Sequence, residues 1–158
     1  MRRTHSHAGL LLIITTVALA LAGCNRDTIY HHYKHTPLTG WEKNDTLLFQ
    51  VPTTSRRAVV KRFVEMRIAG DYPFQSINLI VEQTTLPARL FRRDTLNCNL
   101  ITAGGKIKGE GITLYQYRFA LPDISLNEGD SLAVSIHHNM KREILPGIAD
   151  IGLRLTTY

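Results

Sequence analysis

The sequence predicts an all-β protein, a single antiparallel β-sandwich of the jelly-roll type with about eight strands. Short runs rich in β-branched and aromatic residues recur at spacings of roughly a dozen residues. No stretch keeps an apolar period of 3.6 residues, and turn-forming residues separate the runs. Residues 24–158 suffice for one domain with a single hydrophobic core.

Eight runs are the expected strands. A helix competes only in the run 57–70, because Glu65 and Arg67 favour helices. Met66 and Ile68 alternate with these charged residues, however, and alternation predicts a strand with one buried face. The expected strands are 28–34, 46–51, 57–69, 77–84, 95–102, 113–121, 131–138 and 148–156.

The connections carry turn chemistry. Pro87 cannot donate to a ladder and is expected to end the strand 77–84. The sequence NEGD at 127–130 suits a type I turn with Gly129 in the left-handed conformation. The glycine-rich segment 104–111 precedes a predicted strand instead of a helix. We therefore interpret it as a flexible hairpin connection and not as a phosphate-binding loop.

The N-terminus has the order of a secretory signal. Arg2 and Arg3 precede the apolar run 9–23, which is shorter than the roughly 20 residues of a membrane-spanning helix. The run ends in LAGC, which resembles the lipobox of bacterial lipoproteins. Small residues there admit the signal peptidase, and the thiol of Cys24 accepts a diacylglyceryl group. The alternatives are an ordinary cleaved signal and a short membrane anchor.

This interpretation divides the chain into a lipoprotein signal peptide (1–23), a lipidated N-terminus and tether (24–40), and a β-sandwich domain (41–158). Two or more acyl chains on Cys24 would hold the protein stably at a membrane. Cys98 then has no partner for an intrachain disulfide, and we expect it to be a small buried hydrophobe on a strand.

Charge and histidines indicate no cofactor. The formal net charge of the chain is +6, and it falls to about +4 when Arg2 and Arg3 are removed with the signal peptide. The remaining arginines are scattered along the sequence, and an exported protein does not meet nucleic acid, so we expect no nucleic acid as a partner. On a strand His31 and His35 share one face while His32 faces away, so a polar tether is favoured over a metal site. His137 and His138 are neighbours on a predicted strand, so their side chains should point to opposite faces. We expect one ring to face solvent and the other to face a loop or the core.

Enzyme signatures are missing from the sequence. It holds no Gly-x-Ser-x-Gly elbow and no His-Glu-x-x-His motif, and most aspartates sit in turn-like contexts. We expect no catalytic residues. Loops carry function on β scaffolds, so Tyr72 and Phe74, with Trp41, are candidates to stack on a sugar or a partner protein. For Tyr72 and Phe74 we favour the alternative, that this loop packs its aromatics back over the core.

Several motifs together resemble the gliding-motility lipoproteins of Bacteroidota, the GldH type. They are the lipobox, YPF at 72–74 with NL at 78–79, GGKIKGEG at 104–111 and NMKREILPGIADIGLRL at 139–155. The resemblance implies a non-enzymatic accessory or structural lipoprotein of the envelope, acting with motility, secretion and adhesin-display machinery. Arg142, in the basic pair of the C-terminal block, joins the candidate contact residues.

The resemblance also indicates which side of the membrane the protein faces. Surface-exposed lipoproteins of this phylum tend to carry an acidic stretch after the lipidated cysteine, whereas here only Asp27 follows, beside Arg26. We therefore expect a periplasm-facing anchor in the inner or the outer membrane. The alternative function is a glycan-binding β-sandwich lipoprotein of the envelope, since jelly rolls often bind carbohydrate.

Overall fold

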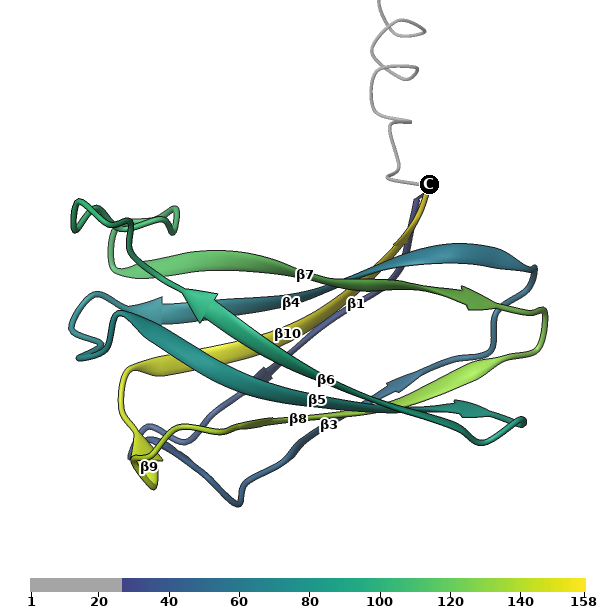
Figure 1. The fold of residues 1–158 in the computed structure, drawn as a ribbon, viewed down its shortest axis with the longest axis horizontal. Coiled ribbons are helices and arrows are strands. Elements are labelled where there is room, and N and C mark those ends of the chain that lie inside the picture. The colour runs from purple at the N-terminus through teal and green to yellow at the C-terminus, as the bar shows by residue number, and fades with distance from the viewer. Residues whose placement is uncertain (1–26) are drawn as a thin grey trace, which may run out of the picture.

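The computed structural model describes residues 27–158 and is all-β. Two four-stranded antiparallel sheets pack face to face, and a two-stranded ladder lies at one end of them (Figure 1). The described residues contain no helix of the length and hydropathy needed to cross a membrane. The predicted signal peptide and Cys24 lie outside the described residues.

The sheets have the strand orders β1-β10-β4-β7 and β3-β8-β5-β6. The strands of the first sheet are β1 (Thr28–His35), β10 (Ile148–Thr157), β4 (Ala58–Ala69) and β7 (Leu114–Leu126). The strands of the second sheet are β3 (Leu47–Val51), β8 (Ser131–His138), β5 (Ser76–Leu86) and β6 (Leu90–Asn99). The ladder pairs β2 (Trp41–Glu42) with β9 (Ile144–Leu145).

This topology is that of a jelly roll. Without β2 and β9, the chain crosses from one sheet to the other after every strand except β5, which forms a hairpin with β6. Neighbouring strands are antiparallel throughout both sheets. The predicted all-β sandwich is confirmed, and the competing helix at residues 57–70 is instead the central strand β4.

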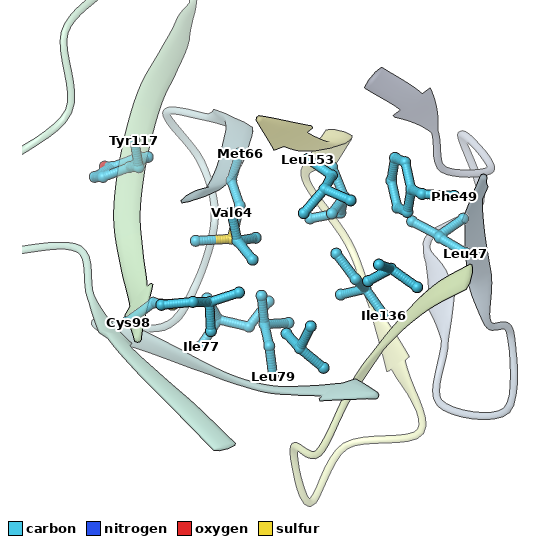
Figure 2. Close-up of a cluster of buried hydrophobic side chains, with 14 of the residues drawn as sticks. Leu47, Phe49, Val64, Met66, Ile77, Leu79, Cys98, Tyr117, Ile136 and Leu153 are labelled. Atoms are coloured by element: carbon cyan, nitrogen blue, oxygen red, sulfur yellow. The ribbon is translucent and has the colours of Figure 1, made fainter. Parts of the chain in front are cut away.

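The core fills the space between the sheets with alternating side chains. Val64 and Met66 of β4 face Ile77 and Leu79 of β5, and all four are buried (Figure 2). Full burial of each such side chain contributes about 1.5–3 kcal/mol. Cys98 of β6 lies in the same core as a free thiol, and burial raises its pKa to about 12. The prediction of a small buried residue on a strand is confirmed.

One charged side chain crosses the core. Arg62 of β4 is 1% exposed and donates to the Gln83 amide oxygen at 2.9 Å and to Asp94 Oδ2 at 3.0 Å. Its Nε and Nη2 also donate to the Pro122 carbonyl of β7, at 3.0 and 2.7 Å. These hydrogen bonds offset the burial of the guanidinium and connect β4 and β7 of the first sheet to β5 and β6 of the second.

The domain begins earlier than predicted. Thr28–His35 is strand β1, paired with β10 along its whole length, so this part of the predicted tether (24–40) belongs to the sandwich. The expectation that the tether enters a strand near 28–34 is confirmed. A polar sequence can be an edge strand because only one of its edges needs a backbone partner.

One connection and one strand differ from the sequence prediction. The segment 100–113 is no hairpin, because β6 and β7 lie in different sheets and the segment crosses between them. Strand β6 begins at Leu90 and ends at Asn99, whereas we expected 95–102. The strand opens with exposed Leu90 and Phe91, and three charged residues follow, so the hydropathy of the sequence does not show where this edge strand begins. The turn at 127–130 is confirmed, since Gly129 has φ of 83° and Asp130 N donates to Asn127 O at 3.1 Å.

Candidate functional site

The outer face of the first sheet carries an organised charged cluster, which we call the Glu65 face. Strand β4 turns its alternate side chains outward, while β1, β10 and β7 present their own outward side chains in register beside them. The Glu65 face consists of His31, Tyr33, His35, Glu65, Arg67, Arg118, Asp150 and Arg154.

Glu65 is the centre of this face. Its side chain is 0% exposed although it points away from the core, because neighbouring side chains cover it. Oε2 accepts from the Tyr33 hydroxyl at 2.5 Å and lies 2.7 Å from His31 Nε2. Oε1 accepts from Arg118 Nε at 2.7 Å, and Arg154 Nη1 is 3.9 Å away. Four side chains from three other strands thus converge on one carboxylate.

These contacts determine the protonation of Glu65 and Tyr33. Burial alone would raise the pKa of Glu65, but hydrogen bonds from Tyr33, His31 and Arg118 outweigh it and lower the pKa of the carboxyl. Burial, with the hydrogen bond to Glu65, raises the pKa of Tyr33 to about 12. The carboxylate is therefore ionised and Tyr33 protonated at neutral pH.

Gly152 makes this arrangement possible. It lies on β10 between Tyr33 on β1 and Glu65 on β4 in the cross-strand register. A Cβ at position 152 would lie 2.7 Å from Cε1 of Tyr33, so only glycine lets the ring lie flat across the strand. The Tyr33 hydroxyl also accepts from Gln116 Nε2 at 3.2 Å, which links β1 to β7 across the whole sheet.

A second carboxylate completes the face. Asp150 is buried and forms ion pairs with His35 and with Arg67 Nη1, the latter at 3.5 Å. The Arg67 guanidinium also lies 4.2 Å from the centre of the Tyr33 ring. His31 and His35 thus share one face, as predicted. No group of three or more His, Cys, Asp or Glu within residues 27–158 is placed to hold a metal ion.

A hollow adjoins the Glu65 face along β7. Its volume is about 620 Å³, and Arg118 belongs both to it and to the Glu65 cluster. The hollow lies between β7 and the connection 100–113. It is lined by Lys108, Glu110, Gly111, Gln116, Tyr117, Arg118 and Phe119. Polar and cationic side chains thus border a space large enough for a segment of another chain.

The candidate contact residues gather at the end of the sandwich opposite Thr28. Trp41 is 0% exposed, donates from Nε1 to Asp45 O at 2.9 Å and packs edge-on against His138. This burial corrects the prediction for Trp41, whose ring is not available to a sugar or a partner. The β2–β9 ladder, which the sequence did not predict, covers it.

The other three candidates are not buried to the same extent. Tyr72 and Phe74 contact each other edge-on with ring centres 5.5 Å apart and are half-buried against the core. The alternative prediction for this loop, that its aromatics pack over the core, is confirmed. Arg142 is exposed in the connection after β8, and its Nε donates to Ile144 O at 3.0 Å.

The two adjacent histidines of β8 face opposite ways, as predicted. His138 is buried, while His137 is half-exposed. Nε2 of His138 lies 3.1 Å from the Trp41 carbonyl, and Met140 N donates to Nδ1 at 3.4 Å. These partners fit the neutral ring that carries its proton on Nε2. Burial lowers the pKa of His138.

The Glu65 face was missed in the sequence, although one signal was available. The sequence indicates only that Glu65 lies on the polar face of a strand or in a helix, and nothing in it places Tyr33 or Arg118 beside this residue. Gly152, an isolated glycine within a predicted strand, is typical of a close approach by another group. It indicated contact across β10 without naming the partner.

Comparisons with known proteins agree on a family. The model of the family described as "GldH lipoprotein" matches residues 28–155. The gliding motility lipoprotein GldH of Flavobacterium johnsoniae is 25% identical over 156 residues, covering 94% of this chain and 95% of that protein. The gliding motility lipoprotein GldH homolog of Christiangramia forsetii is 23% identical over 155 residues, covering 92% and 93%.

Among solved structures, that of Eiger TNF from S. frugiperda has a TM-score of 0.32 and 14% identity, covering 84% of this chain and 94% of that one. The family match spans every long strand of both sheets, from β1 to β10. The chain therefore belongs to the GldH lipoprotein family.

Proposed function

We propose that this protein is a lipid-anchored, non-enzymatic accessory component of gliding-motility and associated secretion machinery in the bacterial envelope. Cys24 carries the lipid, the domain faces the periplasm, and the Glu65 face holds another envelope protein. The observation that carries the proposal is the buried Glu65 cluster on an outer sheet face, in a chain of a family linked to gliding motility.

The Glu65 cluster supports a binding role because a buried carboxylate is unusual on a sheet face that meets only water. On a sheet face that meets only water, ordinary exposed polar side chains are enough. Burying a carboxylate there removes it from water, and the free energy lost in this way must be offset by the groups that bind it. The cluster holds Arg118 and Arg67 in fixed positions while leaving both about half exposed. Fixed, partly exposed arginines are characteristic of protein interfaces.

The charge of the face indicates an acidic partner. Three arginines at positions 67, 118 and 154 outnumber the carboxylates Glu65 and Asp150, while Lys108 and Glu110 balance each other at the adjoining hollow. Such a surface attracts carboxylates and repels basic segments. We infer that an acidic segment of an envelope protein lies along β7 and enters the hollow.

The state of Glu65 supports a role other than catalysis. A general acid or base works best with a pKa near the ambient pH, whereas the pKa of Glu65 is lowered. Its two oxygens are already engaged by Tyr33, His31 and Arg118. A carboxylate held in this way positions its neighbours instead of exchanging protons.

Genetic complementation with affinity capture tests the proposal. The gene is deleted in its host and replaced by wild type, Cys24→Ala, or the double variant Arg67→Glu/Arg118→Glu. We expect Cys24→Ala to abolish fatty-acid labelling, and the double variant to keep labelling but lose spreading and the captured envelope proteins.

The matched control is Arg93→Glu, which reverses an exposed arginine on the outer face of the second sheet, where it pairs only loosely with Glu82 at 3.7 Å. It should behave as wild type. Normal spreading, secretion and capture with the double variant would contradict the role of the Glu65 face. Fatty-acid labelling of the Cys24→Ala protein would contradict the anchor.

A further inference from the structure

The N-terminal chain leaves the sandwich next to the C-terminus. Thr28 pairs with Thr156 in the first sheet, and Thr157 N donates to Asp27 O at 2.7 Å. In Figure 1 the start of β1 and the C-terminus lie together, away from the β2–β9 ladder. We call this the anchor end of the sandwich. It includes the connection 52–57 from β3 to β4 and the last residues of β10.

The length of the tether limits how far this end can lie from the anchor. Only three residues separate Cys24 from Thr28, and a chain of four residues spans at most about 14 Å when fully extended. Lipidation of Cys24, which is part of the proposed function, would therefore hold the anchor end against the lipid headgroups. The surface chemistry of this end then decides how the domain rests on them.

Cationic and amphipathic side chains gather at the anchor end. Arg56 and Arg57 are exposed and form no ion pair with any residue of the described part of the chain. Lys61 Nζ lies 3.8 Å from the centre of the Tyr158 ring. Tyr158 is 74% exposed, and nearby Val59 is 49% exposed. Tyrosine and arginine are typical of surfaces that meet the membrane interface.

Two hollows flank the arginine pair. One, of about 390 Å³, lies between the start of β1 and the connection 52–57, and the other, of about 380 Å³, lies between Arg57 and Tyr158. Arg56 lines both. Each is large enough for a lipid phosphate group, with free guanidinium donors at its rim.

Four carboxylates lie at this end, and two of them accept hydrogen bonds. Asp123 accepts from the Tyr158 hydroxyl at 2.5 Å, and Asp130 accepts from Asn127 N at 2.8 Å and is buried. Asp27, Asp123 and Glu128 are the exposed acids at this end. None of them forms an ion pair with Arg56 or Arg57, so these two guanidinium groups are free to bind the phosphates of anionic lipids.

We propose that the anchor end is a membrane-docking surface, on which Arg56, Arg57 and Lys61 contact the phosphates of anionic lipids and Tyr158 enters the headgroup layer. This inference rests on the proposed lipidation of Cys24. It orients the domain, because a single flexible tether would leave the sandwich free to tumble. In the docked orientation the ladder end points away from the bilayer and the Glu65 face stays open at the side.

The test uses the processed, lipidated chain reconstituted in vesicles of phosphatidylcholine with or without phosphatidylglycerol. A fluorophore is attached to Ser55→Cys at the anchor end or to Thr39→Cys at the opposite end. Cys98 is 0% exposed and is not labelled under native conditions. We expect a quencher on the lipid headgroups to quench the label at 55 several-fold more than the label at 39, with a larger difference on vesicles that contain phosphatidylglycerol.

Charge reversal supplies the matched comparison. Arg56→Glu/Arg57→Glu should remove most of the added quenching by anionic lipid, as should high salt. Lys141→Glu/Arg142→Glu, which reverses an exposed basic pair at the opposite end, should leave it unchanged. Equal quenching at 55 and 39, or no effect of the Arg56 and Arg57 reversal, would overturn the inference.

Flotation of the same samples separates this inference from the anchor itself. A chain that floats with both kinds of vesicle but fails the quenching test overturns only the docking surface. A chain that floats with neither kind overturns the lipid anchor, and the docking inference with it.

Discussion

Tyr33 lies flat across Gly152 of the neighbouring strand, and a Cβ at position 152 would come within 2.7 Å of its ring. This close approach carries the Tyr33 hydroxyl over β10 to Glu65 on the strand beyond. The glycine is needed for space and not for an unusual dihedral angle, since its φ lies outside the left-handed region. The whole Glu65 face depends on this one missing side chain.

Gly152→Ala should therefore displace Tyr33 and destabilise the domain by about 1–3 kcal/mol, the usual range for overpacking. Chemical denaturation of the purified domain measures this. Gly104→Ala is the control, because the nearest atom to a Cβ there is 3.9 Å away, and its stability should stay within about 0.5 kcal/mol of wild type. Equal stability of the two variants would contradict the account of Gly152.

Glu65→Gln should make the protein less sensitive to acid. The pKa of Glu65 is lowered in the folded state, so its contribution to stability is full above the unfolded pKa of about 4.3 and is lost as the pH falls through the folded value. Near neutral pH the variant should lose about 1.5–3 kcal/mol, the range for a hydrogen bond to a charged group.

Unfolding free energies between neutral and strongly acidic pH test this prediction. Glu82→Gln is the control, because Glu82 also lies on an outer sheet face but is half-exposed and faces Arg93 at 3.7 Å. Its stability should follow the wild-type pH profile. A Glu65→Gln profile as steep as that of wild type in acid would show that Glu65 is not the group responsible.

Arg62→Ala should cost roughly 3–5 kcal/mol, because it leaves the partly buried carboxylate of Asp94 without its main partner. Arg92→Ala removes the other arginine bound to Asp94, at 3.2 Å, but this side chain is 41% exposed and should contribute at most about 1 kcal/mol. Thermal or urea unfolding of the two variants measures the difference. Similar losses would mean that burial does not control the strength of these pairs.

His138 should make the domain lose stability below about pH 6.5, where the unfolded imidazole takes up a proton. Burial lowers its pKa in the folded state, so stability is full above pH 6.5 and falls as the pH drops toward the folded value. His138→Gln should remove this dependence between pH 5 and 7, as followed by urea unfolding. His137→Gln, at the half-exposed neighbour, should retain it.

Much of the fold could be predicted because alternation is local information. The alternation of Val64, Met66 and Ile68 predicts the buried face of β4 from only five residues of sequence. Gly129 likewise predicts its turn from a segment of only four residues. The start of β6 could not be predicted, because its first residues, Leu90 and Phe91, are exposed and three charged residues follow them. The short β2–β9 ladder has no sequence pattern, since two residues are too few to show a period.

The candidate site shows the same division. Fold class and the burial of Cys98 follow from residue type and local order, as does the prediction of a lipobox ending at Cys24. The meeting of Glu65 with Tyr33, and the burial of Trp41 against His138, required the tertiary structure. The residues of these two pairs are 32 and 97 positions apart in sequence, and only the folded arrangement of the strands brings them together. The sequence thus determined which faces are buried, and the structure alone decided which side chains meet on them.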